Sequence, residues 1–189
     1  MGDSELIGRA RMGDGAAWES LVSAQQEAVF RLAYLLLGDA QEAEDVAQET
    51  FVRAFRALDR FDADRSSSIR PWLLSIAANL SHNRRRSIGR YLAAHGRFVQ
   101  ARPEQVSYIG ERTAQQWEAE TLWQAVKRLK PNEQEVVYMR YFLDLSEAEM
   151  ASAMGVAPGT VKSRLHRALQ RLRGVVDQEF PALREERQT

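Results

Sequence analysis

Apolar residues recur at helical spacing along this chain, and no segment alternates between apolar and polar residues as a strand would. One stripe stands at positions i, i+3, i+4 and i+7 of a single helix face: Leu73, Ile76, Ala77 and Leu80. Further apolar stripes that we expect to face a core are Val46, Phe51, Phe55 and Leu58; Leu122, Ala125, Val126 and Leu129; Val136, Val137, Met139 and Tyr141; and Val161, Leu165, Ala168, Leu169 and Leu172. The sequence therefore predicts an all-α fold.

The length of 189 residues allows one medium domain or two small ones. Between residues 89 and 113 the helical spacing is lost, and Gly96, Pro103 and Gly110 interrupt the chain, which is typical of a linker. We predict two small helical domains, residues 1–95 and 115–180, joined by a flexible linker of residues 96–114 and followed by a tail of residues 181–189.

Composition excludes several classes of protein. The chain has no cysteine, and His82, His95 and His166 are too scattered for a metal cage, so we expect no disulfide, metal or cofactor. We find no nucleophile–base set and no Gly-rich phosphate loop in the sequence, so we expect no enzymatic activity. The acidic start and a longest apolar run of residues 32–37 fit neither a signal peptide nor a membrane span. We therefore expect a cytoplasmic protein without membrane insertion.

Charge is balanced overall, with 26 basic and 26 acidic residues, but it is segregated along the chain. Residues 39–64 are mainly acidic, whereas residues 65–102 contain eight arginines and no acid. Residues 158–174 form a second basic stretch without an acid. Two separate surfaces for a polyanion would explain this pattern, and two solvated helical faces remain the alternative on charge alone.

Residues 145–173 have the pattern of a short helix, a tight turn and a longer helix. Ser146 and Glu149 form a capping box, in which each side chain accepts a hydrogen bond from the other residue's backbone N–H. Gly155 suits the left-handed conformation of a tight turn, and Pro158 suits the first turn of the next helix. This spacing is that of a helix-turn-helix, although any three-helix bundle contains a helix pair with glycine at the turn.

The second helix of this unit carries side chains outside its apolar stripe that suit phosphates and major-groove base edges: Thr160, Lys162, Ser163, Arg164, His166 and Arg167. Residues 155–168 closely resemble the promoter −35 recognition helix of sigma-70 family factors of the extracytoplasmic-function (ECF) group, and residues 129–141 resemble the preceding part of the same region 4. The resemblance implies that Thr160 and Arg164 hold phosphates while the other four residues approach −35 bases. It also implies contact with the flap of the second-largest polymerase subunit.

Residues 37–54 resemble sigma regions 2.1 to 2.2, whose helix docks on the coiled coil of the largest polymerase subunit. Because the apolar stripe of this helix faces the core, we expect an outward polar patch that consists of Asp45, Gln48, Glu49, Arg53 and Arg56. On the charge pattern alone, a solvated helix face is the alternative. The resemblance implies that the patch binds polymerase.

Residues 71–86 resemble sigma regions 2.3 and 2.4, which open and read the −10 element. Melted DNA needs a basic groove and pockets for unstacked bases. The residues expected to supply them are Ser66, Ser67 and Ser68 in a loop, and Asn79, Asn83, Arg84 and Arg86 on the helix. Trp72 is either a core residue or a stacking platform beside the DNA.

Together these features favour an ECF-type sigma factor with two helical domains. The expected partners are core RNA polymerase, promoter DNA and an anti-sigma factor. The alternative is a helix-turn-helix repressor or activator that binds duplex DNA alone, but the first half of the chain offers it neither a dimer face nor a sensor domain.

Overall fold

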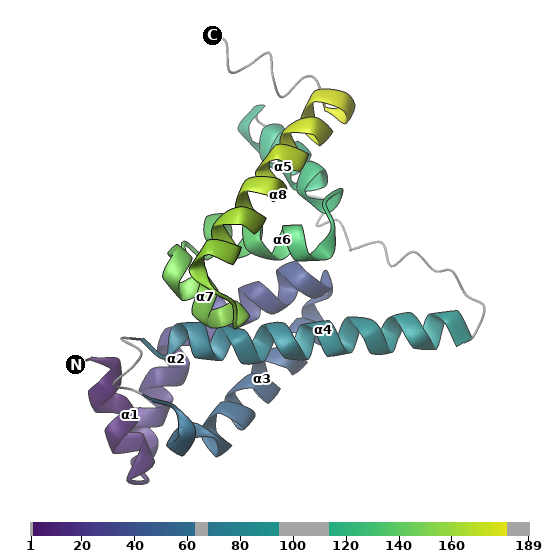
Figure 1. Ribbon diagram of the computed structural model, residues 1–189. Coiled ribbons are helices and arrows are strands. Elements are labelled where there is room, and N and C mark those ends of the chain that lie inside the picture. Colours follow the sequence, from purple (N-terminus) through teal and green to yellow (C-terminus); the bar gives the residue numbers. More distant parts are fainter. Residues whose placement is uncertain (1, 63–67, 95–113, 181–189) are drawn as a thin grey trace. The chain divides into compact units, whose positions relative to one another are not determined.

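The computed structural model of the chain describes residues 2–62, 68–94 and 114–180, and all regular structure in these residues is helical, as predicted (Figure 1). The helices form two compact units. The first contains α1 to α4, and the second contains α5, α6, most of α7 and α8. Among the described residues, none of the helices has an apolar stretch long enough to cross a membrane.

The first unit consists of α1 (Asp3–Arg11), α2 (Gly15–Leu37), α3 (Ala40–Arg56), the 3-10 helix η1 (Leu58–Arg60) and α4 (Arg70–Ala94). Local chemistry sets several of its helix ends. The Asp14 carboxylate caps α2 by accepting from the Ala17 N–H at 3.1 Å, and Asp39 caps α3 by accepting from the Glu42 N–H at 2.8 Å. Gly38 ends α2 with a φ of 76°, the left-handed conformation that glycine adopts without strain.

The core of this unit lies between α2, α3 and α4, which pack against one another, while α1 packs on α2 (Figure 1). Small side chains occupy its centre and let the helix backbones approach closely: Ala33, Ala43, Ala54 and Ala77 are fully buried. Larger residues fill the remaining space, among them Leu21, Leu32, Leu73 and Leu74. The α4 helix also continues through Gly89 to Ala94, beyond the residue at which the sequence loses its apolar spacing.

The expected core face of α3 was wrong in one residue. Phe55 is 53% exposed, and its ring packs on Trp18 of α2 with the ring centroids 5.3 Å apart. The buried stripe runs instead through Ala43, Val46, Thr50 and Ala54. Thr50 tolerates burial because its hydroxyl donates to the Val46 carbonyl at 2.7 Å.

The second unit consists of α5 (Ala114–Lys127), α6 (Pro131–Val137), the π-helix η2 (Tyr138–Phe142), α7 (Glu147–Met154) and α8 (Pro158–Glu179). The α6 helix packs on α8 and α5, and α5 also packs on α8. The Gln134 side-chain amide ties α6 to the end of α5 by donating to the Lys127 and Leu129 carbonyls at 3.0 and 2.9 Å. These bonds satisfy carbonyls that a helix end leaves without an intrahelical partner.

Three residues expected in the core of this unit are exposed instead: Leu122 (43%), Tyr141 (54%) and Leu169 (36%). For Tyr141 the cause is η2, in which the Leu143 N–H donates to the carbonyl of Tyr138, five residues earlier. This wider turn breaks the 3.6-residue spacing that the sequence analysis assumed. Tyr138 is buried in place of Tyr141 and packs against Trp123 with ring centroids 5.5 Å apart.

Candidate nucleic-acid and partner interfaces

The α7–turn–α8 segment has the local chemistry that the sequence predicted. The Glu149 carboxylate accepts from the Ser146 N–H at 2.8 Å, and the Ser146 hydroxyl accepts from the Glu149 N–H at 3.2 Å, which confirms the capping box. Gly155 has a φ of 63°, and Pro158 is the first residue of α8. Ala157 occupies the N-cap position of α8 without a side-chain hydrogen bond, so proline and the packing of α8 define where this helix begins.

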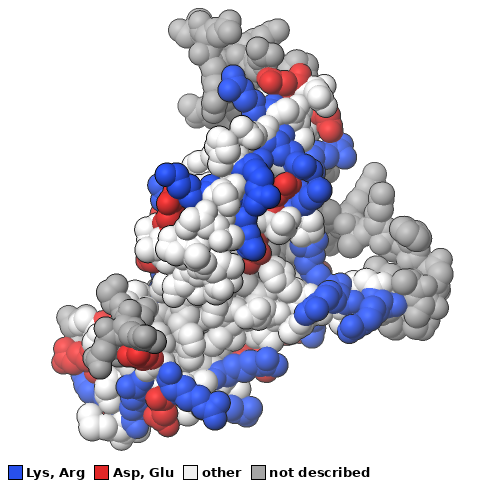
Figure 2. All heavy atoms as spheres, in the orientation of Figure 1, with Lys and Arg blue, Asp and Glu red and all other residues white. Residues whose placement is uncertain are grey.

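The α8 helix has one buried face and one polar face. Val161, Leu165 and Ala168 are buried. Lys162, Ser163, His166 and Arg167 are exposed, whereas Thr160 and Arg164 are half-buried at the margins. Figure 2 shows the basic side chains that follow this helix. The sequence analysis therefore places these six residues correctly outside the core, on a surface that a polyanion can reach.

Two contacts on α8 affect how its polar side chains are held. Arg167 Nε donates to the Ser163 carbonyl at 3.2 Å, so this guanidinium lies back along the helix. Arg171 forms an ion pair with Glu133 of α6 at 3.3 Å. Arg171 therefore links α8 to α6, although it belongs to the same basic stretch of the sequence.

The α4 helix presents a second polar face. Asn79, Asn83 and Arg86 are all exposed, and Arg86 Nη2 donates to the Asn83 side-chain oxygen. Figure 2 shows basic side chains gathered along the C-terminal half of this helix. The structure thus brings these three residues together on one face, as their spacing predicted.

The structure describes one of the three serines that we expect in the −10 loop. Ser66 and Ser67 lie outside the described residues. Ser68 is half-buried, and its hydroxyl donates to the Asp3 carboxylate at 3.1 Å and accepts from the Arg70 N–H at 3.2 Å. Nearby, Trp72 is half-buried and its ring packs on Phe61 with centroids 5.0 Å apart, which favours a packing role for Trp72.

Arg84 points away from the face that Asn79, Asn83 and Arg86 share. Its guanidinium donates to Glu42 and, at 3.1 Å, to Asp45, both on α3. The hydrogen bond to Glu42, helped by the charges of Glu42 and Asp45, raises the pKa of Arg84 above its usual value. Arg84 therefore bridges α4 to α3, a contact that its place in the basic run of residues 84–86 does not indicate.

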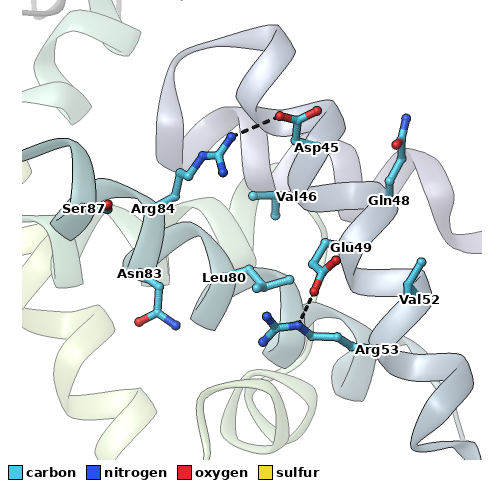
Figure 3. A pocket seen from close by; sticks show the side chains of 10 residues that line it. All are labelled: Asp45, Val46, Gln48, Glu49, Val52, Arg53, Leu80, Asn83, Arg84 and Ser87. Atoms are coloured by element: carbon cyan, nitrogen blue, oxygen red, sulfur yellow. Dashed lines mark hydrogen bonds and ion pairs between the residues drawn. The ribbon is translucent and has the colours of Figure 1, made fainter.

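An open groove of about 580 Å³ lies between α3 and α4, and Figure 3 shows the ten side chains that line it. Four residues of the expected polar patch, Asp45, Gln48, Glu49 and Arg53, lie on its α3 wall, whereas the fifth, Arg56, is exposed but does not line the groove. Arg84 reaches across from α4 to Asp45, and Glu49 pairs with Arg53 at 2.7 Å along α3 (Figure 3). The patch is thus one wall of a groove rather than an isolated helix face.

The sequence analysis missed the apolar part of this groove. Val52 is 43% exposed and lines the groove together with Val46 and Leu80. A signal for Val52 was available, because it stands at i+7 from Asp45 and i+4 from Gln48 and so shares their helix face. The apolar stripe of α4 predicts Leu80 in the core, and no local pattern indicates that its half-buried side chain also reaches the groove.

Two family models match the chain, one in each unit. Residues 21–91 match Sigma-70 region 2, and residues 119–172 match Sigma-70, region 4. The groove and the polar face of α4 lie within the first match, and the helix-turn-helix lies within the second.

Individual relatives match over most of the chain. The ECF RNA polymerase sigma factor SigW of Bacillus subtilis is 31% identical over 175 residues, which cover 88% of this chain and 92% of SigW. The RNA polymerase sigma-H factor of Pseudomonas aeruginosa is 33% identical over 198 residues, covering 97% of this chain and 96% of that protein. Among solved structures, CnrH in complex with the cytosolic domain of CnrY is similar with a TM-score of 0.68 and 25% identity, covering 94% of this chain and 98% of that one.

Proposed function

We propose which surfaces of this chain bind polymerase and which bind DNA, and we start from the family to which it belongs. The chain is a member of the sigma-70 family of RNA polymerase sigma factors and of its ECF group. As a member of this family the protein directs promoter-specific transcription initiation by RNA polymerase and is not itself an enzyme. The observation that carries the proposal is the separation of faces. A groove lined by apolar residues and by the ion pairs Glu49–Arg53 and Asp45–Arg84 lies between α3 and α4. Asn79 and Arg86 of α4 and the polar residues of α8 are exposed outside this groove, and Asn83 borders both surfaces of α4.

The groove between α3 and α4 is the proposed polymerase-binding site in residues 1–95. Asp45, Gln48, Glu49 and Arg53 offer charges and amides for partner selection, and Val52 adds exposed apolar surface beside them. A surface that combines a few apolar residues with a polar rim is suited to a protein partner. We propose the coiled coil of the largest polymerase subunit as that partner, with the flap of the second-largest subunit binding residues 115–180.

The exposed face of α4 is the proposed −10 surface. Asn79 and Asn83 carry amides that can pair with the edge of an unstacked base, and Arg86 beside them supplies positive charge for the backbone. Ser66, Ser67 and Ser68 precede this helix and complete the proposed set. The corresponding −35 surface is the exposed face of α8, whose Lys162, Ser163, His166 and Arg167 are proposed to meet bases while Thr160 and Arg164 hold phosphates.

A regulatory protein is the third proposed partner. The solved structure of CnrH contains the cytosolic domain of CnrY, so a similar fold binds a second protein there. We propose that an anti-sigma factor binds this chain and that the protein acts in the cytoplasm, where it meets polymerase. The linker of residues 96–114 is proposed to let the two units adjust to each partner.

Run-off transcription tests the proposed function as a whole. Purified full-length protein, core polymerase and a promoter library should yield specific transcripts only when all three are present. The protein alone should bind duplex promoters weakly, because its formal net charge is +0 and each unit offers only a part of the site. Tight sequence-specific duplex binding by the isolated chain, without transcription, would support the repressor alternative.

The polymerase-binding groove gives a prediction with a matched control. Asp45→Arg should lower affinity for core polymerase by about tenfold or more, because it reverses a charge at the groove wall. Glu44→Arg makes the same charge change at an adjacent exposed residue that does not line the groove, and it should leave core affinity within about twofold of wild type. Fluorescence anisotropy of labelled protein titrated with core measures both variants. Equal losses for the two variants would show that this groove is not the docking site.

Arg84 and Arg86 separate polymerase binding from DNA reading within one run of arginines. Arg84→Ala removes the guanidinium that holds the Asp45 carboxylate in place at the groove wall, and it should weaken core binding by up to about fivefold, the factor that corresponds to ~1 kcal/mol for an exposed ion pair. Its −10 base preference should stay unchanged. Arg86→Ala should keep core affinity and weaken open-complex formation. Core titration and permanganate footprinting of both holoenzymes check this, and the reverse pattern would return Arg84 to the DNA surface.

On α8, Arg167 is predicted to contact a base and Arg164 to contact a phosphate. Arg167→Ala should cost about 1–3 kcal/mol and relax preference at one −35 position, as expected for an arginine that pairs with a guanine. Arg164→Ala, which removes a phosphate contact, should weaken all sequences alike and reduce the salt slope by about one. Selection from a −35 library and a salt titration with each holoenzyme make the comparison. A single-base effect from Arg164→Ala would mean that the helix is rotated in the groove relative to our assignment.

A further inference from the structure

The α1 helix lies outside the residues that match Sigma-70 region 2, which begin at residue 21, and none of the faces proposed above uses it. It nevertheless makes polar contacts with chain segments that are 47 to 66 residues distant in sequence. These contacts fall at the two described ends of the connection between η1 and α4. They are therefore evidence about how that connection is held.

Arg11 holds the end that follows η1. Its Nε and Nη2 both donate to the Leu58 carbonyl, at 3.1 and 3.0 Å, and Nη2 also donates to the Phe61 carbonyl. One guanidinium thus binds two backbone carbonyls three residues apart, a geometry that its planar fork of donors favours. The Phe61 side chain is itself buried against Trp72, so this end is fixed from both sides.

Asp3 holds the end that precedes α4. One carboxylate oxygen, Oδ2, accepts from the Ser68 hydroxyl and from the Ile69 N–H, both at 3.1 Å. The Ile69 N–H belongs to the start of α4, where backbone donors lack intrahelical partners and a carboxylate is favourable. Ile69 is fully buried, so this end too is anchored in the core.

A single rigid element connects these two contacts. Asp3 and Arg11 are the first and last residues of α1, which at 1.5 Å per residue puts their backbones about 12 Å apart. Ile7 and Ala10 of α1 are buried, and α1 packs on α2 and touches η1. The helix therefore fixes the distance between Phe61 and Ser68 as a spacer with a hydrogen-bonding group at each end.

We propose that Asp3 and Arg11 are positioning residues for −10 reading, because they set the separation and direction of the chain at Phe61 and at Ser68. The inference rests on the proposed function, which assigns the serines of this connection to base capture, and it concerns only its two described ends. Neither residue touches DNA. They act by holding the described ends of the connection, at Phe61 and at Ser68.

The experiment compares Asp3→Ala and Arg11→Ala with Glu5→Ala in full-length holoenzyme. Glu5 is an exposed acid in the same first turn of α1, so Glu5→Ala removes equal charge without touching the connection. Selection from a −10 library with a fixed −35 element gives the discrimination between matched and mismatched bases. Core affinity, −35 preference and thermal unfolding are measured on the same proteins.

Asp3→Ala and Arg11→Ala should each lower −10 discrimination by about tenfold, the factor that corresponds to loss of a hydrogen bond to a charged group. Core affinity and −35 preference should stay within about twofold of wild type, as should everything measured for Glu5→Ala. Asp3→Asn should restore discrimination, since its amide oxygen can accept the same two hydrogen bonds. If Asp3→Ala does not fold, Arg11→Lys decides, because it keeps the charge but lacks the fork that reaches both carbonyls.

Two failures are distinguishable. If wild-type holoenzyme shows no −10 base preference, the proposed function of the α4 side of the molecule is wrong. If wild type discriminates and the folded Asp3 and Arg11 variants discriminate equally well, only the inference about α1 is wrong. A uniform loss on all promoters that follows a loss of core affinity would also overturn it, since that result indicates a general structural role.

Discussion

The close packing of α3 on α4 is the constraint on which both proposed surfaces of the first unit depend. Ala43 and Ala54 of α3 and Ala77 of α4 are fully buried, whereas the larger side chains Val52, Leu80 and Arg84 line the groove at the edge of the packing. Buried hydroxyls do not disturb this contact. Thr50 and Ser81 each donate to a carbonyl of their own helix, at 2.7 and 2.8 Å, which avoids the cost of about 1–3 kcal/mol for an unsatisfied buried polar group. The same pair of helices thus offers a groove with paired charges between α3 and α4, and an exposed face of α4 that carries Asn79 and Arg86.

Dividing promoter recognition between two units has a physical consequence for affinity. Each unit carries only a small basic face, and the acidic stretch of residues 39–64 offsets part of the positive charge. Two weak sites joined by a linker bind strongly only when something fixes their spacing, because the second contact then benefits from a high effective concentration. A polymerase that holds both units would supply that spacing. Under the proposed function, the polymerase-binding groove and the balanced charge are therefore parts of one arrangement, in which DNA binding depends on the larger partner.

Local patterns predicted the elements of this chain well, and tertiary contacts explain what they missed. The capping box at Ser146 and the turn at Gly155 follow from nearest neighbours, so spacing alone located them. Phe55 and Tyr141 were misplaced because the analysis favoured large aromatics for the core, whereas close helix packing selected Ala54 and a π-helical turn moved Tyr138 inward. The prediction of the groove was incomplete because its second wall comes from α4, 27 to 42 residues away in sequence from the α3 wall. Asp3 and Arg11 have no local signal at all, since their partners lie 47 to 66 residues away.

The three consecutive arginines of α4 show why a run of like charge is not a single site. Successive helical residues are rotated by about 100°, so Arg84, Arg85 and Arg86 leave the helix in three directions. Arg84 meets Glu42 and Asp45, Arg86 meets Asn83, and Arg85 is half-buried between them. Likewise Arg171 of α8 is paired with Glu133. Because an arginine already paired with a carboxylate neutralises less phosphate charge, counting basic residues overstates the number of DNA contacts. The salt dependence of promoter binding should reflect the smaller number of arginines that project from the α4 and α8 faces.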